Sequence, residues 1–357
     1  MLHFHALRVK EIAKETADCV SIAFAVPDEL QSAFQFQQGQ NITVKATING
    51  TELRRSYSIC SAPFEGELRV AVKKVEQGQF STFANEQLQV GDVLEVMPPT
   101  GRFNTPLLPQ QQKKYLAFAA GSGITPIISI IKTTLHTEPE SQFTLVYGNR
   151  SRASIVFFEA LEALKNKYLQ RFNFINVLSR EKTDAPLSFG RIDSEKMQAL
   201  GKMIDFATMD EVFICGPEGM VFCVKDYLLG QGLDSKKIHF ELFAPPGQKT
   251  ATEKTGEGNK SDGPKSKVTV QLDGRSFDFE LGFDSDSILD AAMKQGADLP
   301  FACKGGVCCT CKAKLLQGEV EMQVNYGLEH EEVEQGYILT CQARPITEKI
   351  VVDFDIK

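Results

Sequence analysis

Residues 115–126, YLAFAAGSGITP, decide the fold class of the central part of this chain. An apolar run ends in a Gly-Ser-Gly turn, and the residues that follow begin a helical pattern. A strand, a glycine-rich turn and a helix in this order are typical of a parallel α/β sheet, where the helix N-terminus can hold a pyrophosphate. The spacing is not G-x-G-x-x-G, so this stretch taken alone is also explained by a tight turn into a core helix.

The same alternation continues on the C-terminal side of this stretch. Apolar runs and helical stretches follow one another, which predicts a parallel-sheet α/β domain over residues 110–243. The expected strands are 115–120, 143–147, 172–178 and 211–215, and the expected helices are 126–136, 155–168 and 219–231.

Residues 1–104 have a different pattern, with short β-rich runs, Gly, Pro and Asn-Gly turn signals, and no long helical period. This pattern predicts a small antiparallel β-barrel or sandwich domain, and we expect the barrel. The expected strands are 19–25, 41–48, 68–74 and 93–97.

Residues 245–266 contain no aromatic residue and a single aliphatic side chain, Ala251, so we expect a flexible linker. Beyond it, residues 267–357 predict a separate α+β domain with strands at 267–272 and 277–281 and a helix at 287–296. This domain carries 9 basic and 16 acidic side chains, a difference of −7 that equals the net charge of the whole chain.

The composition is that of a globular protein. The chain has 357 residues, 42% hydrophobic and 24% charged, which is enough for two or three domains. We find no secretory signal and no apolar run long enough to span a membrane, so we expect a cytoplasmic protein with no membrane partner. The acidic balance argues against nucleic acid as a partner.

Five of the nine cysteines lie in the last 55 residues. The stretch 303–311, CKGGVCCTC, together with a later cysteine has the C-x4-C-x2-C…C spacing of a plant-type [2Fe-2S] cluster. The predicted ligands are Cys303, Cys308, Cys311 and Cys341, which leaves Cys309 spare. Structural zinc is the competing interpretation, although it usually takes two compact pairs of ligands.

A second group of residues lies in the β-rich segment. Arg55, Tyr57 and Ser58 fit the R-x-Y-S flavin motif of the ferredoxin-NADP reductase superfamily, and the chain resembles that superfamily. The resemblance implies FAD. The Arg55 guanidinium can pair with a pyrophosphate, the Tyr57 ring can lie on the isoalloxazine, and Ser58 can act as a catalytic residue near flavin N5.

The phosphate loop of that superfamily, G-x-x-S, resembles Gly78 to Ser81, which follow Lys74. The resemblance implies that these three residues contact FAD.

Two further motifs resemble the superfamily's nucleotide-binding turns. The first is GxGITP, in which Gly121, Gly123 and Thr125 would bind the nicotinamide coenzyme. The second is CGP, in which Cys215 would be catalytic beside the nicotinamide and Gly216 and Pro217 would bind the coenzyme. These motifs occur in the superfamily's order, which favours the functional interpretation over isolated turns.

The residues that follow one predicted strand indicate whether the coenzyme is NADPH or NADH. A 2′-phosphate requires cations and hydroxyls, whereas a ribose 2′-hydroxyl is usually bound by a carboxylate. Ser179 and Arg180 resemble the SRE sequence of NADPH-specific members, and Arg150 follows the preceding strand. We therefore expect NADPH rather than NADH.

The last resemblance concerns the whole chain. CKGGVCCTCKAKLLQGEVEM, GYILTCQ and VVDFD are similar to the reductase subunits of phenylacetyl-CoA epoxygenases. This implies a three-domain protein with a β-barrel, an α/β domain and a β-grasp ferredoxin domain, which passes electrons from NADPH through FAD and [2Fe-2S] to a di-iron, multi-subunit oxygenase. Phe243 resembles a family aromatic near the flavin, although a core role is favoured for it. Cys309 occupies a position that is often Gly or Ser in the cysteine loop of such ferredoxin domains.

Two other functions stay open at this point. The chain resembles reductases of other oxygenase or hydroxylase systems in its domain order, and a non-catalytic ferredoxin-like carrier would need no hydride donor. A self-contained oxygenase is disfavoured, because none of the five histidines forms a plausible iron site with a second histidine and a carboxylate.

Overall fold

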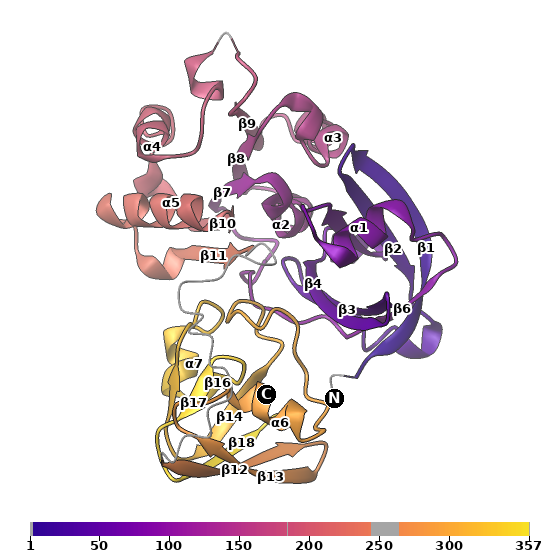
Figure 1. Cartoon of the computed structure of the whole chain (residues 1–357). Helices are drawn as coiled ribbons and strands as arrows, with labels where there is room; N and C mark the ends of the chain where they lie inside the picture. Colours follow the sequence, from indigo (N-terminus) through magenta and orange to yellow (C-terminus); the bar gives the residue numbers. More distant parts are fainter. Residues whose placement is uncertain (1–2, 184, 244–263, 357) are drawn as a thin grey trace. The chain divides into compact units, whose positions relative to one another are not determined.

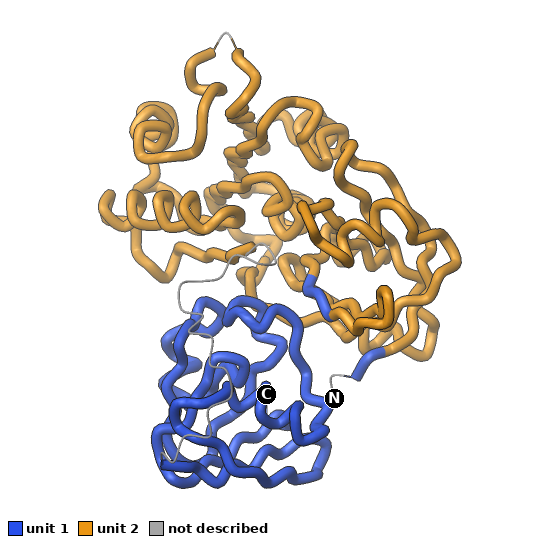
Figure 2. Tube along the Cα trace, viewed as in Figure 1, with its two compact units in different colours: residues 1–4, 54–56, 245–357 blue, residues 5–53, 57–244 orange. Residues whose placement is uncertain are grey.

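The computed structural model describes residues 3–183, 185–243 and 264–356 (Figure 1). The chain divides into two compact units, one made mainly of the C-terminal domain and the other of the preceding residues, with residues 54–56 grouped with the first (Figure 2). Residues 245–263 of the predicted linker 245–266 lie outside the described residues. Its last two residues, Lys265 and Ser266, are part of a strand.

The N-terminal domain is an antiparallel barrel. Its six strands have the order β4-β3-β6-β1-β2-β5. Ile59, directly after β4, forms a bridge with Val70 of β5 and so joins the two ends of the sheet. The strand bounds are β1 His5–Thr16, β2 Cys19–Ala25, β3 Asn41–Ile48, β4 Thr51–Ser58, β5 Leu68–Lys73 and β6 Val93–Val96. One short helix, α1 (Gln79–Glu86), follows β5 and packs its buried Phe80 into the barrel core.

The next domain is a five-stranded parallel sheet with the order β11-β10-β7-β8-β9. Helices α2 and α3 lie on one face, and α4 and α5 lie on the other (Figure 1). Because all five strands are parallel, their carboxyl ends lie at one edge of the sheet, the usual place for ligands in open α/β sheets. The bounds are β7 Lys114–Ala120, α2 Ile124–Thr137, β8 Gln142–Asn149, α3 Phe158–Lys167, β9 Phe172–Leu178, α4 Ser194–Leu200, β10 Glu211–Gly216, α5 Glu218–Gly230 and β11 Ile238–Leu242.

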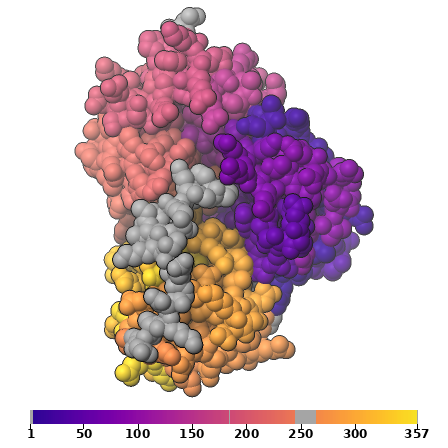
Figure 3. Space-filling model, viewed as in Figure 1, coloured from indigo at the N-terminus to yellow at the C-terminus, as the bar shows by residue number. Residues whose placement is uncertain are grey.

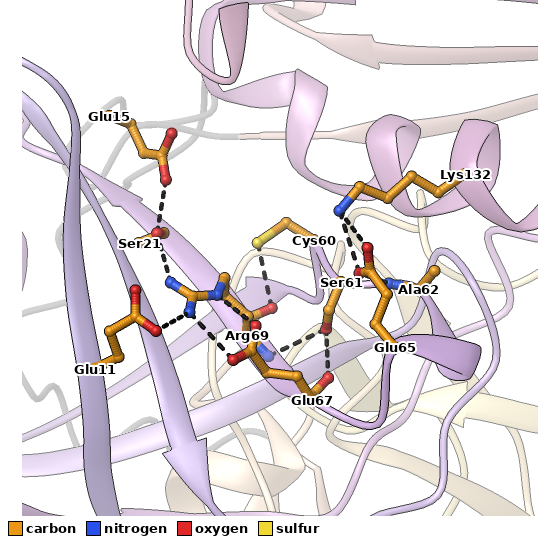
Figure 4. A network of polar contacts seen from close by, with 10 residues as sticks. All are labelled: Glu11, Glu15, Ser21, Cys60, Ser61, Ala62, Glu65, Glu67, Arg69 and Lys132. Carbon is orange, nitrogen blue, oxygen red and sulfur yellow. Dashed lines mark hydrogen bonds and ion pairs between the residues drawn. The ribbon is translucent and has the colours of Figure 1, made fainter. Parts of the chain in front are cut away.

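The barrel and the parallel sheet are in direct contact (Figure 3). The Lys132 ammonium group on α2 lies 2.9 Å from the Glu65 carboxylate, and the Ser129 hydroxyl donates to the Ser61 carbonyl over 2.7 Å. On the barrel side, the Arg69 guanidinium binds the carboxylates of Glu67 and Glu11 (Figure 4). The contacts of Lys132 and Ser129 join α2 to the segment between β4 and β5, so residues of both domains can form one site.

The C-terminal domain has a core of its own around buried Val268, Ile288, Leu339 and Ile350. Its mixed sheet has the order β13-β12-β18-β14-β16 and packs on α6, which is the predicted β-grasp arrangement. Helix α6 begins after Ser287, whose hydroxyl accepts the Asp290 amide over 3.2 Å as an N-cap. The bounds are β12 Lys265–Leu272, β13 Arg275–Gly282, α6 Ile288–Lys294, β14 Lys312–Gln317, β15 Val320–Met322, α7 His330–Glu334, β16 Tyr337–Leu339, β17 Ala343–Pro345 and β18 Lys349–Asp353.

Within the described ranges, no helix has both the length and the apolar character needed to cross a bilayer.

Candidate active site and cluster-binding loop

Strand β4 carries the three residues predicted to bind the flavin. Ser58 is buried, whereas Arg55 and Tyr57 are partly exposed and lie on one face of the strand because side chains alternate. The Tyr57 ring lies 5.5 Å from the ring of Phe80 at the start of α1. Strand β4 and the N-terminus of α1 are therefore neighbours, as a site for a ring and its phosphates requires.

The predicted phosphate loop lies at the N-terminus of α1, with Gly78 at the N-cap position. A Cβ added to Gly78 would lie 2.4 Å from both Ser81 Oγ and Val75 Cγ2, so a larger residue would force these side chains to move. Ser81 Oγ donates to the Gly78 carbonyl over 3.1 Å and accepts the Val75 amide. Free amides at a helix N-terminus suit a diphosphate, so this loop fits the phosphates of FAD.

Lys74 is placed differently from the other predicted flavin ligands. Its ammonium group pairs with Glu86, the last residue of α1, at the opposite end of the helix from Gly78. This ion pair gives no support to the predicted contact between Lys74 and FAD.

The two predicted nucleotide turns pack against each other at the carboxyl edge of the parallel sheet. A Cβ on Gly123 would lie 2.2 Å from the Cys215 carbonyl oxygen, and one on Gly216 would lie 2.8 Å from Met220. Gly121, by contrast, has φ +53° and open space on its Cβ side. Gly123 packs tightly against the second turn, whereas no protein atom lies within 4 Å of a Cβ on Gly121. This arrangement fits a pyrophosphate bound beside Gly121.

Buried hydroxyl groups brace the first turn. The Tyr147 hydroxyl donates to the Gly121 carbonyl over 2.8 Å, and Thr125 Oγ1 donates to the Ser122 carbonyl over 3.0 Å. Thr125 is 2% exposed. Its predicted contact with the nicotinamide would therefore involve a side chain that the protein almost completely covers. Pro217 is the N-cap residue of α5 and ends the second turn.

A carboxyl group connects the flavin and nucleotide residues. Glu241 on β11 pairs with Cys215 on β10 in the parallel register, and its Oε2 lies 3.4 Å from the Ser58 hydroxyl. The residue retains some exposed surface, but its carboxyl group is enclosed by protein, and this burial raises its pKa to about 7. Burial, with a smaller contribution from Glu241, raises the pKa of Cys215 well above its usual value, so Cys215 is a neutral thiol.

Glu241 is not among the residues predicted from the sequence. A signal was present, because Glu241 is the one acidic residue within the run 238–243, IHFELF, that ends the nucleotide domain. Phe243, two residues later, is partly buried and packs against the core of the parallel sheet.

The residues predicted to choose the coenzyme lie at the carboxyl ends of β8 and β9. The Arg180 amide donates to the Arg150 carbonyl over 2.8 Å, which brings the two exposed arginines together, and Ser179 follows β9 directly. The carboxylate of Glu181 accepts the Arg152 amide over 2.8 Å. The carboxylate of this stretch is thus bound to the protein backbone, whereas two exposed arginines have adjacent main chains at the edge.

The four predicted cluster cysteines form two facing pairs. The thiol group of Cys308 is a neighbour of the Cys303 thiol and affects its pKa, and the thiols of Cys311 and Cys341 are related in the same way. Backbone amides point at these sulfurs: the Gly305 amide donates to Cys303 Sγ over 3.3 Å, and the Cys303 amide donates to Cys308 Sγ over 3.4 Å. The hydrogen bond from Cys308, followed by backbone amides, lowers the pKa of Cys303 to about 6.

This arrangement fits a two-iron cluster better than zinc. Two pairs of thiolates, each facing one iron, are the arrangement of a [2Fe-2S] centre. Cys309 has φ +55° and donates its thiol to the Gly327 carbonyl over 2.7 Å, so it belongs to neither pair.

Comparisons with known proteins agree with this arrangement. Residues 6–105 match the oxidoreductase FAD-binding domain family, residues 118–226 the oxidoreductase NAD-binding domain family, and residues 270–345 the 2Fe-2S iron-sulfur cluster binding domain family. The predicted fold class and the predicted FAD, pyridine nucleotide and [2Fe-2S] cofactors are therefore confirmed, and a non-catalytic carrier is not supported.

Relatives match over the full length. The chain is 51% identical over 358 residues to a subunit of the 1,2-phenylacetyl-CoA epoxidase of Escherichia coli (strain K12), covering 100% of this chain and 99% of that protein. It is 34% identical to the ferredoxin reductase component of 3-ketosteroid-9-alpha-monooxygenase of Rhodococcus rhodochrous, covering 98% and 96%. Phthalate dioxygenase reductase has the same fold, with a TM-score of 0.59, 24% identity and 98% coverage of both chains.

The chain therefore belongs to the family of FAD- and [2Fe-2S]-containing reductase components of oxygenase systems that includes this 1,2-phenylacetyl-CoA epoxidase subunit.

Proposed function

We propose that this chain takes electrons from NADPH and passes them through FAD and a [2Fe-2S] cluster to the oxygenase of a phenylacetyl-CoA epoxidase system. The 51% identity to the epoxidase subunit over the whole chain carries this proposal. We expect the partner to be a multi-subunit, di-iron oxygenase in the cytoplasm. The proposed domains span residues 1–104, 110–243 and 265–357, with the third domain starting two residues earlier than predicted because β12 begins at Lys265.

The flavin and cluster would supply the redox chemistry, since FAD accepts two electrons with a hydride and a [2Fe-2S] centre accepts one electron at a time. We propose that Tyr57 holds the flavin ring, that Arg55 pairs with its pyrophosphate, and that the amides around Gly78 and Ser81 bind its phosphates. Each role is supported by the position of the residue on β4 or at the N-terminus of α1.

We assign the nucleotide pyrophosphate to the open side of the turn at Gly121, with the second turn beside it. Ser58 of the barrel contacts Glu241, which is the register partner of Cys215, and we propose that these three residues line the place where the nicotinamide meets the flavin. Burial raises the pKa of Glu241 to about 7, and its Oε2 accepts the Ser58 hydroxyl over 3.4 Å, which orients that hydroxyl.

We propose a preference for NADPH because positively charged side chains lie at the ends of two strands of the parallel sheet. Arg150 and Arg180 bring two guanidinium groups to the ends of β8 and β9, and these groups pair well with a dianionic 2′-phosphate. The Glu181 carboxylate, which could otherwise accept a ribose 2′-hydroxyl, is bound to the Arg152 amide.

The cluster is proposed to be held by Cys303 and Cys308 on one iron and by Cys311 and Cys341 on the other, because these are the facing pairs. Thiolates bind iron only when deprotonated, and the amides that point at Cys303 and Cys308 favour that state.

The test is reconstitution with purified oxygenases. The holoprotein is mixed with a phenylacetyl-CoA epoxidase oxygenase, phenylacetyl-CoA and NADPH, and coupled product formation is expected. A parallel mixture contains a 3-ketosteroid 9α-monooxygenase oxygenase and its steroid. Turnover only in the steroid mixture would contradict the proposed partner, and a Cys341→Ser variant serves as the control without electron transfer.

A further inference from the structure

We propose that Gln342, which is not a cluster ligand, is a positioning residue that raises the reduction potential of the [2Fe-2S] cluster by binding both halves of its ligand set. This inference rests on the proposed ligands Cys303, Cys308, Cys311 and Cys341. Gln342 directly follows the last of them and is half-buried. Its side chain packs across the cysteine loop, where its Cγ would lie 3.2 Å from a Cβ on Gly306.

The two N–H groups of the Gln342 amide have two different acceptors. Nε2 lies 3.7 Å from Cys341 Sγ, within reach of an N–H to sulfur hydrogen bond, and 2.9 Å from the Lys304 carbonyl oxygen. A primary amide has two donors, so both contacts can be made at once. The first contact acts directly on a ligand of one thiol pair.

The second contact acts on the other pair through one peptide group. The Lys304 carbonyl and the Gly305 amide belong to the same peptide, and no cis peptide occurs among the described residues. In a trans peptide the carbonyl oxygen and the amide hydrogen point in opposite directions. Gln342 binds the oxygen, and the hydrogen on the other side is donated to Cys303 Sγ over 3.3 Å.

This peptide needs such a restraint. Lys304 has φ +52°, a left-handed conformation that a residue with a Cβ rarely adopts, so the peptide would readily turn away if it were not held. Backbone hydrogen bonds fix Gln342 itself, from its own amide to the Leu339 carbonyl over 2.8 Å and from the Gln323 amide to its carbonyl over 3.1 Å. The side chain therefore reaches the loop from a fixed position.

The sign of the effect follows from charge. Reduction adds one electron to the cluster, and part of the added negative charge is carried by the thiolate sulfurs. An N–H group that points at a sulfur stabilises the reduced state more than the oxidised state, so it raises the potential. Gln342 supplies one such group to Cys341 and holds a second one on Cys303, so its loss should lower the potential.

The experiment is a potentiometric titration of the full-length holoprotein, followed by the EPR signal of the reduced cluster. Gln342→Leu should lower the midpoint potential, and Gln342→Glu should lower it further because a carboxylate repels both acceptors. Gln317→Leu, on the exposed end of β14, is the matched control and should keep the wild-type value. A wild-type midpoint in Gln342→Leu with full iron and sulfide content would overturn the inference.

A measurement on the unaltered chain covers the case in which the variants lose the cluster. After glutamine side-chain amides are labelled with ¹⁵N, pulsed EPR of the reduced wild-type cluster should detect a coupled ¹⁵N nucleus. Its absence would also overturn the inference. Failure of the ligand set gives a different result, because the cluster absorbance would then survive in Cys303→Ser or Cys341→Ser whatever the midpoint of Gln342→Leu.

Discussion

The Ser58 hydroxyl lies 3.4 Å from Oε2 of Glu241, and this contact joins the flavin strand of the barrel to the edge strand of the parallel sheet. The same carboxyl group is the register partner of Cys215 on β10. A protonatable group thus lies between the residue predicted near the flavin and the residue predicted near the nicotinamide. Burial raises the pKa of this carboxyl group to about 7, so its charge changes near neutral pH.

We expect Glu241→Gln to remove a pH dependence of stability. The pKa of Glu241 is about 7 in the folded chain and has its usual value near 4.5 in the unfolded chain. Between these values the folded state binds more protons, so the free energy of unfolding of the wild type falls as pH rises from about 4.5 to about 7. The loss should be about 2 kcal/mol or less, since part of the residue is exposed.

The measurement is urea unfolding of the FAD-saturated protein across this pH range. Glu241→Gln should be flatter than the wild type, whereas Glu280→Gln, an exposed residue of β13, should follow the wild type. Equal pH slopes in wild type and Glu241→Gln would show that the folded-state pKa of this carboxyl group is not raised.

The second prediction separates Cys309 from the proposed ligands. Serine at position 303, 308, 311 or 341 should abolish or severely reduce the visible cluster absorbance, because an alkoxide ligand replaces a thiolate. Cys309→Ser should keep the absorbance, since a hydroxyl can still donate to the Gly327 carbonyl. Loss of the cluster in Cys309→Ser together with its retention in Cys308→Ser would show that the assignment is wrong.

The third prediction concerns the coenzyme. Arg180→Ala should raise the Michaelis constant for NADPH about tenfold and change that for NADH little, because a guanidinium pairs with the 2′-phosphate that NADH lacks. Lys202→Ala, which removes an exposed cation that follows α4, is the control and should affect neither. A wild type that reduces its flavin better with NADH would contradict the NADPH proposal.

The fourth prediction uses two glycines with different surroundings. Gly123→Ala places a methyl group 2.2 Å from the Cys215 carbonyl, so one of the two turns must move. We expect a loss of about 2 kcal/mol in stability and weaker coenzyme binding. Gly219→Ala is the control, because a Cβ there meets no atom within 4 Å. If coenzyme affinity were equal in the two variants, the close packing of the turns would not matter for binding.

Much of the fold could be predicted from hydrophobic patterns. The predicted bounds of β2, β3 and β9 agree with the structure, because these strands are apolar runs bounded by turn signals. Helix α1 could not be found this way. Its eight residues, QFSTFANE, are too short and too polar to show a helical period, and the helix is stabilised by Phe80 in the barrel core.

The parts of the candidate site whose chemistry fixes the spacing of residues along the sequence could be predicted. The parts that depend on contacts between residues far apart in the sequence could not. Four thiols around a cluster require a local loop, so Cys303, Cys308 and Cys311 are visible as a motif. Glu241 and Ser58 are 183 positions apart, and only the register of β11 and its contact with β4 bring them together. Gln342 is similar, since its amide finds its second acceptor in a loop 38 residues earlier.

The last prediction tests the order of electron transfer. The C-terminal domain has its own core, and the barrel and parallel sheet are joined by the Lys132–Glu65 and Ser129–Ser61 contacts. A chain shortened to residues 1–243 should therefore keep FAD and reduce ferricyanide with NADPH. It should reduce cytochrome c much more slowly than the full chain, because it lacks the cluster that releases single electrons.

Adding residues 264–357 as a separate chain should restore cytochrome c reduction only at high concentration. In the full chain the covalent connection holds the cluster domain near the flavin at an effective concentration of about a millimolar, whereas separate chains must meet by diffusion. The rates are compared at equal flavin content, with Cys341→Ser in the full chain as the control for a C-terminal domain that is present without a working cluster. Undiminished cytochrome c reduction by residues 1–243 would show that electrons leave the flavin directly, and the order from NADPH through FAD to the cluster would then be wrong.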